Sequence, residues 1–224
     1  MSTTGMHDQE KAKYKKRVCK EDRREQILLI ASQIFSQKGF NGATTKEIAE
    51  QVGVSEAIIF RHFPSKQALY SAILDNKTTE LMQPLWLKCE ELMLKKDDRE
   101  VFVTLAAQIL EVIHKDTTLL RLLFYSALEK HQLAKNFLET TARQVREPAV
   151  IYIKQRIADG DFRSIDPVLA AKFFFSLVKQ WALGRDLFQE NDKQMVSSWE
   201  AAKEITNIFL FGVSKNQDFP KLEE

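Results

Sequence analysis

Apolar residues at helical spacing run almost from end to end of this chain, and few turn-forming residues interrupt them. Seven glycines and five prolines are spread over 224 residues, and no segment shows the sustained apolar–polar alternation of a half-buried strand. Gly39 and Gly160 follow apolar runs as helix stops, and Asp166 before Pro167 forms a helix start. The sequence therefore predicts an all-α fold.

Capping residues, glycines and prolines set the bounds of the expected helices. Pro84 should end or bend the helix that Ser65 caps, and Pro148 should kink or break a later helix. Residues 1–20 lack an apolar face, and we interpret them as a mobile arm. Helices are expected at about 22–38, 45–51, 55–60, 66–84, 85–96, 98–114, 118–129, 133–158, 166–188 and 193–212.

Basic residues gather at the N-terminal end, although the net charge of the whole chain is only +2. Residues 1–66 carry 12 basic and 8 acidic side chains, whereas the remainder carries 21 and 23. Within 11–24, eight lysines and arginines face two acids. A basic head on a mildly acidic body favours contact of the head with a polyanion. A solubilising tail is the alternative for the basic segment.

The remaining composition narrows the class of protein. Cys19 and Cys89 are the only cysteines, and neither has further ligands nearby at metal spacing. No apolar stretch approaches the ~20 residues that a membrane-spanning helix needs, and the N-terminus lacks the apolar centre of a signal peptide. Neither a phosphate-binding glycine loop nor a nucleophile elbow is present. We therefore expect a cytoplasmic protein that is not an enzyme, with no cofactor, no metal and no membrane partner.

The most informative motif is TTKEIAEQVGVSEAIIFRHFPSK at 44–66. Thr44 and Glu47 fit a capping box, in which each side chain accepts a hydrogen bond from the other residue's amide. Gly53 permits the left-handed backbone of a three-residue turn, and Ser55 should cap the next helix. The motif has a small residue, then a glycine four positions later, then an apolar residue six positions after the glycine. This spacing predicts a helix-turn-helix, whose second helix enters the major groove of DNA.

The flanks extend this motif into a family pattern. Residues 23–74 resemble the N-terminal domain of the tetracycline-repressor (TetR) family, including Lys-Gly-Phe at 38–40 and the block FRHFPSK at 60–66. The resemblance implies a three-helix helix-turn-helix domain followed by a larger helical domain for dimerisation and ligand binding. The expected parts are an arm at 1–20, a DNA-binding domain at 21–81 with the helix-turn-helix at about 44–63, and the second domain at 82–224.

The resemblance also implies which residues contact DNA. Arginine and lysine can bind guanine edges and glutamate can accept from a cytosine amine, whereas a helix N-terminus can hold a phosphate. Phe60 stands where the family usually has tyrosine, so the hydroxyl that would bond to a phosphate is absent. Caps, a packing role for His62 and a solvated Glu56 are the alternatives. Contacts near the bases are expected from Lys46, Glu56, Ala57 and Arg61, and phosphate contacts from Thr44, Thr45, Ser55, His62 and Lys66.

In the family, the C-terminal helices enclose a small-molecule pocket and form the dimer. Residues 157–184 resemble the join between the family's seventh and eighth helices. Apolar walls with a few polar groups are typical of small-molecule sites, and ordinary core packing is the alternative. Candidate ligand contacts are Trp86, Phe102, Phe124, Tyr125, Phe137, Phe174 and Trp181 among aromatic residues, and Gln108, His114, Arg121 and Gln180 among polar ones.

We therefore expect a homodimeric DNA-binding transcriptional regulator, a repressor that a small, largely apolar or amphipathic ligand releases from a palindromic operator. One alternative is a DNA-bound dimer that acts through a protein partner without a small-molecule effector. Another is an all-α enzyme or lipid carrier. The helices at about 166–188 and 193–212 are the predicted dimer surface, because their apolar area exceeds what one chain covers. Ile205 and Phe209 are expected within it.

Overall fold

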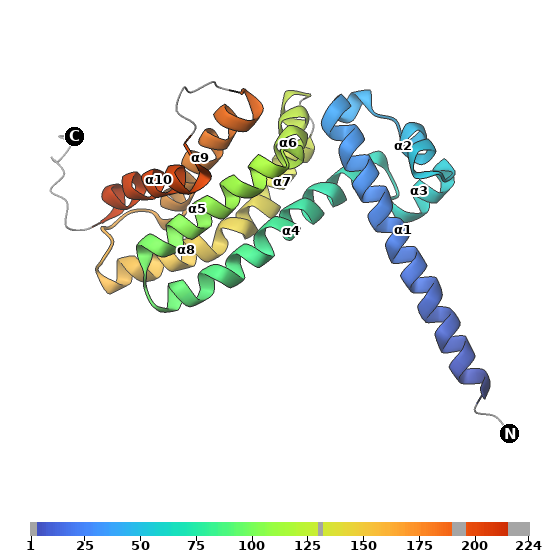
Figure 1. Cartoon of the computed structure of the whole chain (residues 1–224), viewed down its shortest axis with the longest axis horizontal. Helices are drawn as coiled ribbons and strands as arrows, with labels where there is room; N and C mark the ends of the chain where they lie inside the picture. The colour runs from blue at the N-terminus through green and yellow to red at the C-terminus, as the bar shows by residue number, and fades with distance from the viewer. Residues whose placement is uncertain (1–3, 130–131, 190–195, 215–224) are drawn as a thin grey trace. The chain divides into compact units, whose positions relative to one another are not determined.

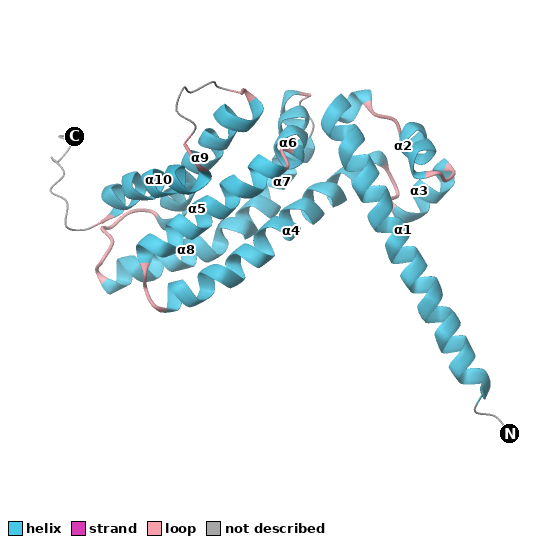
Figure 2. Cartoon of the chain, viewed as in Figure 1, coloured by secondary structure: helices cyan, strands magenta, loops and turns pink. Residues whose placement is uncertain are grey.

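The computed structural model describes residues 4–129, 132–189 and 196–214, and it is built from helices joined by short connections (Figures 1 and 2). In these three ranges, β-structure is limited to a single bridge between Phe162 and Ser214. The all-α prediction is confirmed. The elements are α1 Thr4–Gly42, α2 Thr45–Val52, α3 Glu56–His62, α4 Lys66–Leu94, α5 Asp98–Lys115, α6 Thr118–Leu128, α7 Gln132–Glu139, α8 Thr141–Asp159, α9 Pro167–Ala182, the π-helical turn η1 Leu183–Leu187, and α10 Ser198–Val213.

The chain divides into two compact units. Unit one consists of Met1–Asn76 and Arg121–Ala134, and unit two of Lys77–Leu120 and Lys135–Glu224. Unit one therefore ends within α4, shortly before the boundary expected at residue 81. It also takes most of α6 from the sequence range that was expected to belong wholly to the second domain.

The core of unit one is an aromatic cluster that joins α1 to α4. The Phe35 ring stacks on the Phe40 ring with centroids 6.0 Å apart, and the Tyr70 ring meets both edge to face at 5.0 and 5.4 Å. The Tyr70 hydroxyl donates a hydrogen bond to the backbone carbonyl of Leu122 in α6. Burial raises the pKa of this hydroxyl above its usual range, with Glu129 as a second cause, so it stays a donor.

Three side chains at four-residue intervals, two on α6 and one directly after its end, hold the backbone at the end of α1. We call Arg121, Tyr125 and Glu129 the α6 clamp. Helix ends carry carbonyl and amide groups that lack partners within the helix, and the clamp supplies such partners. Arg121 Nε donates to the Ser36 carbonyl at 2.9 Å, the Tyr125 hydroxyl to the Gln37 carbonyl at 3.2 Å, and Glu129 Oε2 accepts from the amides of Phe40 and Asn41 at 3.1 and 3.2 Å.

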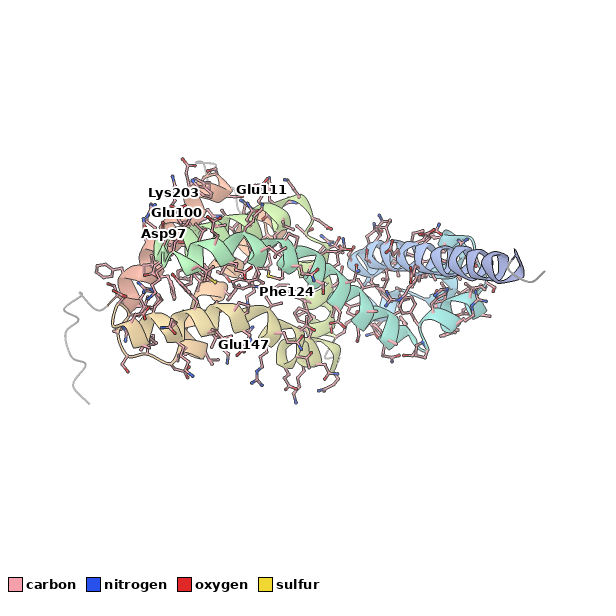
Figure 3. The ribbon with its side chains drawn as sticks, turned by 90° about the horizontal axis from the view of Figure 1, so that it is seen from below. Asp97, Glu100, Glu111, Phe124, Glu147 and Lys203 are labelled. Atoms are coloured by element: carbon pink, nitrogen blue, oxygen red, sulfur yellow. The ribbon has the colours of Figure 1, made fainter. Side chains whose placement is uncertain are left out.

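Unit two is centred on α5, which packs against α9 and α10. The Phe102 ring lies 4.9 Å from that of Phe174 and 4.8 Å from that of Phe209, both edge to face. Buried Arg156 ties α8 to α5 by two hydrogen bonds to Asp98, at 2.8 and 3.1 Å. In Figure 3, Glu100 and Glu111 of α5 lie beside Lys203 of α10, along the edge where these helices pack.

Several helix bounds differ from those expected. Helix α1 begins at Thr4 rather than near residue 22, because residues 4–20 contain five lysines, a residue type that extends an existing helix readily. Helix α4 continues through Pro84, and α8 through Pro148. The break expected at Pro148 falls at Thr140 instead, between α7 and α8. Tertiary packing in a long helix outweighs the one hydrogen bond that a proline removes.

The last helix has a start that the sequence pattern did not reveal. Ser197 caps α10 in a complete capping box with Glu200, so the helix begins at Ser198. The start expected at Lys193 lies outside the described residues. The predicted caps at Asp166 and Ser65 and the stop at Gly160 are confirmed, and of the two expected caps of α5, Asp97 and Asp98, the structure uses Asp97.

Substitution of Gly39 should destabilise unit one. Its φ of 73° lies in the left-handed region, and an added Cβ would lie 2.5 Å from Glu129 Oε1. Left-handed backbone costs about 1–2 kcal/mol for a non-glycine residue, and the clash adds to that cost. Gly39→Ala should therefore lower the free energy of unfolding by more than about 1–2 kcal/mol, measured by urea denaturation with circular dichroism.

Two other glycines provide matched controls. Gly53 has a φ of 75° with nothing within 4 Å of the added Cβ, so Gly53→Ala should show the backbone cost alone. At Gly42 an added Cβ makes one contact of 3.4 Å, to Lys38, and no left-handed backbone is involved. Gly42→Ala should be neutral or stabilising by up to about 1 kcal/mol. Equal effects at Gly39 and Gly42 would contradict this account.

Candidate DNA-binding surface and ligand pocket

The helix-turn-helix is formed by α2, a short turn and α3, with their apolar faces turned to α1. Ile48, Ala49 and Ile59 are buried between these helices. Gly53 ends α2 in the left-handed conformation, with φ 75° and ψ 38°, as the sequence predicted. Its amide and that of Val54 bond to the last turn of α2, so the turn directs α3 away from α2 at a fixed angle.

The capping box predicted at the start of α2 is half formed. The Thr44 hydroxyl accepts from the Glu47 amide at 3.1 Å. The Glu47 carboxylate pairs instead with Lys38 Nζ at 2.6 Å, because a charged partner on α1 competes well with a neutral amide. Ser55 occupies the N-cap position of α3, but its side chain makes no capping hydrogen bond there. The predicted position of the cap is therefore confirmed, but the side-chain hydrogen bond expected of a cap is absent.

The residues expected to contact DNA lie on α2, on α3, at the N-caps of these two helices and at the first position of α4. Thr45 and Glu56, at the first positions of α2 and α3, are joined by a short hydrogen bond between hydroxyl and carboxylate. Lys46 and Arg61 are exposed, and neither forms an ion pair with any described residue. Of the ten predicted contacts, Thr44, Lys46, Ser55, Ala57, Phe60 and Arg61 are exposed, and Thr45, Glu56, His62 and Lys66 are partly buried.

Aromatic residues line the back of this surface. The Lys66 ammonium lies 4.5 Å from the centroid of the Phe40 ring, and the Arg24 guanidinium 5.1 Å from that of Phe63. Burial lowers the pKa of Lys66, while the Glu129 charge opposes this shift. The Phe60 ring is 44% exposed, so an apolar side chain stands at the position where a tyrosine was expected from the family pattern.

A pocket of about 1110 Å³ lies between α4 and α8 in unit two. The two helices run in the same direction (Figure 1), so the pocket is elongated along both. Pro84 and Pro148, the two prolines inside helices, both line it. Apolar side chains form most of its wall, and their exposed members at the mouth are Leu87, Leu94 and Ile151.

Two polar groups in this wall are buried without a partner among the described residues: the Thr78 hydroxyl and the Trp86 indole N–H. Thr78 is only 4% exposed. An unsatisfied buried polar group costs about 1–3 kcal/mol, which a hydrogen-bonding ligand could recover. By contrast, the Tyr152 hydroxyl in the same wall donates to Asp98 at 2.6 Å. Burial and this carboxylate raise the pKa of Tyr152 well above its usual range.

The candidate ligand residues fall in several different places. Trp86 lines the pocket, and the other ten do not. Phe102 and Phe174 form the aromatic core of unit two, and Phe137 is buried on α7. The remainder lie as follows: Arg121 and Tyr125 belong to the α6 clamp, Phe124 is on α6 (Figure 3), Gln108 accepts from Lys88, His114 Nδ1 is 2.9 Å from Asp186, and Gln180 and Trp181 end α9.

Sequence reasoning missed most of the pocket wall. Thr78, Met82 and Met93 of α4 and Val145 and Ile151 of α8 line the pocket. Helical spacing marks these residues as one face of each helix, but it does not show whether that face is packed or open. The two prolines inside helical patterns were the available signal, and they were interpreted only as bends, kinks or ends of helices.

A second apolar surface lies on α9 and α10. Phe173 and Ile208 are more than half exposed, whereas Ile205 and Phe209 are buried inside unit two at 8% and 5% exposure. The expected placement of Ile205 and Phe209 in a dimer surface is therefore corrected, because they face α5 and the aromatic core. The exposed members are Val168, Leu169, Phe173 and Leu177 on α9 and Trp199, Ile208 and Phe211 on α10; we call them the α9–α10 face.

The described ranges contain neither a metal centre nor a membrane-spanning helix. No three His, Cys, Asp or Glu side chains there are grouped as metal ligands would be. No described helix is long and apolar enough to span a membrane.

Comparisons with known proteins agree with this geometry. The chain is 36% identical to the nucleoid occlusion factor SlmA of Mannheimia succiniciproducens over 74 residues, 33% of this chain and 34% of that protein. It therefore spans about a third of that relative's length. It is 26% identical to the transcriptional repressor KstR2 of Rhodococcus jostii over 162 residues, 69% of this chain and 75% of KstR2. The solved structure of the fatty acid degradation regulator FadR from Bacillus halodurans superposes with a TM-score of 0.68, at 18% identity, covering 85% of this chain and 95% of that one.

Two family models match the two parts of the chain. Residues 27–73 match the model described as bacterial regulatory proteins, tetR family. Residues 100–211, half of the chain, match the model described as AefR-like transcriptional repressor, C-terminal domain. The chain belongs to the TetR family of transcriptional regulators.

Proposed function

We propose that this regulator is a homodimeric repressor, released from a palindromic operator by a small apolar molecule bound between α4 and α8. TetR-family regulators are non-enzymatic proteins that bind DNA as dimers. The observation that carries the effector part is the α4–α8 pocket, with its apolar wall and the unsatisfied groups of Thr78 and Trp86. The similarity to the transcriptional repressor KstR2 and to the C-terminal domain of AefR-like transcriptional repressors supports repression. A DNA-binding role supports the expected cytoplasmic location.

The DNA-facing residues are assigned roles by their exposure and chemistry. Arg61 and Lys46 are exposed basic residues without an ion pair to a described residue, and their side chains are suited to bind guanine edges or phosphates. Because Glu56 is held by Thr45, its carboxylate is fixed in position before DNA binds. Phe60 offers no hydroxyl, but an exposed ring can contact a thymine methyl group or a sugar.

Release of the operator would act through the distance between the two helix-turn-helix units of the dimer. Half-sites on one face of B-DNA lie about 34–36 Å apart. A change of a few ångströms in the distance between the two helix-turn-helix units therefore weakens operator binding. Helix α4 begins at Lys66, directly after the helix-turn-helix, and its later turns line the pocket. A ligand that binds better to one position of α4 than to another shifts the equilibrium between the two states.

A protein partner in place of a small molecule is the second candidate. The relative SlmA is a nucleoid occlusion factor, which supports a role other than gene regulation. Leu87, Leu94 and Ile151 at the mouth of the pocket are large exposed apolar side chains, which protein interfaces also use. Selection of bound sequences from a random DNA pool, repeated with the small-molecule fraction and the protein fraction of a cell extract, separates the two. Release by the protein fraction alone would reject the small effector.

Removal of either exposed basic side chain should weaken binding of the protein to its operator. Lys46→Ala and Arg61→Ala should each cost about 1–3 kcal/mol on the selected operator, measured by fluorescence anisotropy at fixed salt. Lys154→Ala is a matched control, because Lys154 is also an exposed basic residue but lies on α8 in unit two. If all three variants bind as the parent does, the assignment of the DNA-facing surface is wrong.

Deletion of residues 1–20 should reduce the salt dependence of DNA binding. The segment 11–24 concentrates eight basic residues, and α1 continues through it towards the N-terminus. The slope of log K against log salt should fall by about 0.9 for each DNA phosphate that the shortened protein no longer neutralises. An unchanged slope would support the alternative of a solubilising tail.

Charged substitutions on the α9–α10 face should separate the dimer without unfolding the chain. Phe173→Asp and Ile208→Asp place a carboxylate on exposed positions, so sedimentation should show folded monomers that do not bind the operator. Leu128→Asp, on an exposed residue of α6, is the control and should remain dimeric. A folded monomeric parent at micromolar concentration would contradict the proposed interface.

The buried neighbours should behave differently. Ile205→Asp and Phe209→Asp place a charge inside unit two, where an unpaired ion costs several kcal/mol. These variants should lose helical signal or melt at much lower temperature. Loss of the dimer at these positions with an unchanged melting temperature would contradict their placement in the core.

A further inference from the structure

The α4–α8 pocket has an unusual charge balance for a site that opens to solvent. Among the residues that line it, Glu90 alone carries a formal charge at neutral pH. The polar remainder consists of threonines, glutamines, the Trp86 indole and the Tyr152 phenol. The lining therefore carries a net charge of −1 and offers no basic side chain to an acidic ligand.

Two basic side chains on the helices that form the pocket, those of Lys88 and Arg156, bind to residues outside its lining. Lys88 donates to Gln108 at 3.3 Å. Arg156 is held by Asp98 and pairs with two further carboxylates, Asp159 and Asp161, at 2.8 and 2.9 Å. None of Lys77, Lys88, Arg143, Arg146, Lys154 and Arg156 is among the lining residues. An anionic head group would thus enter an apolar pocket without a counter-charge, which is costly.

Glu90 is placed to receive a positive charge. It follows Trp86 by four residues on α4, so the two side chains are neighbours on one helix face. It is exposed and forms no ion pair with a described residue, whereas the adjacent Glu91 pairs with Lys95 at 2.5 Å. An indole ring also attracts cations more strongly than any other side-chain ring.

We propose that the α4–α8 pocket selects lipophilic cations. The apolar body of the ligand lies against Met82, Val145 and Ile151, and its positive charge lies between Trp86 and Glu90. The volume of about 1110 Å³ has room for a bulky aromatic or alkyl body. This inference rests on the proposed small-molecule site, and it adds the charge class of the ligand.

Two probes of nearly the same shape and opposite charge test the inference. Tetraphenylphosphonium and tetraphenylborate are titrated separately into the full-length protein without DNA, and affinity is measured by calorimetry. The cation should bind more tightly than the anion by at least about fivefold, and the difference should shrink as salt is added. Equal affinities, tighter binding of the anion, or no binding of either probe would overturn the inference.

Variants of Glu90 locate the preference in the pocket. Glu90→Gln should weaken binding of the cation by about fivefold and leave the anion unchanged or slightly tighter. Glu90→Lys should reverse the preference. Glu91→Gln is the matched control, because Glu91 is the adjacent carboxylate and does not line the pocket. An equal effect of Glu91→Gln and Glu90→Gln would assign the preference to general surface charge and overturn the proposal. Equal melting temperatures confirm that each variant is folded.

DNA release is measured separately, so that the two proposals can fail independently. If the cation binds with the Glu90 dependence but leaves the operator complex intact, the release mechanism is wrong and the charge class of the pocket stands. If the operator is released by a neutral or anionic compound and tetraphenylphosphonium does not bind, the charge class is wrong and the release mechanism stands.

Discussion

The α6 clamp is the interaction on which the geometry of unit one depends. Helix α1 turns through left-handed backbone at Gly39, and the amides of Phe40 and Asn41 that follow donate to the Glu129 carboxylate. These amides lie only a few residues before the cap of α2 at Thr44. The position at which the helix-turn-helix begins is therefore set by a side chain that lies far away in the sequence. Since the clamp binds backbone groups, changes of side chain at Ser36 or Gln37 would leave its bonds intact.

Unit two depends on a different kind of contact. An aromatic core around Phe102 joins α5, α9 and α10, and the Arg156–Asp98 pair joins α8 to α5. The Lys96 ammonium and the Gln155 amide, followed by Arg156, lower the pKa of Asp159 to about 2, so this carboxylate stays charged near neutral pH. These contacts fix α8 on one side, and the side of α8 that contains Pro148 remains open to the pocket. One face of α8 is thus packed against its neighbours, and the other face of α8 lines the pocket.

Local signals in the sequence predicted local structure well. Gly53, Gly160 and the Asp166–Pro167 pair each act within one turn of the helix they start or stop, so their roles could be predicted from neighbouring residues alone. The spacing and the family resemblance together located the helix-turn-helix. Features that depend on distant partners could not be obtained in this way. Arg121 was expected at a ligand and binds Ser36 instead.

Helical spacing also left the choice between a packed and an open face undecided. Ile205 and Ile208 lie on one helix within a single turn, yet one is buried and the other is 64% exposed. Both are apolar, so sequence alone assigns them to the same surface. Likewise, Pro84 was expected to end or bend its helix and Pro148 to kink or break its helix, and each lies within a continuous helix. Their common feature, a position in the pocket wall, becomes visible only when α4 and α8 are placed side by side.

The buried thiol of Cys89 on α4 can be used to measure how often the helices of unit two separate. The side chain is fully buried, and burial raises its pKa to about 11. Alkylating reagents attack the thiolate, so Cys89 reacts only during the moments when the surrounding helices separate. In a Cys19→Ser background, the rate of labelling would measure how often unit two opens. A ligand that stabilises the closed packing of α4 would slow that rate, whether or not DNA is present.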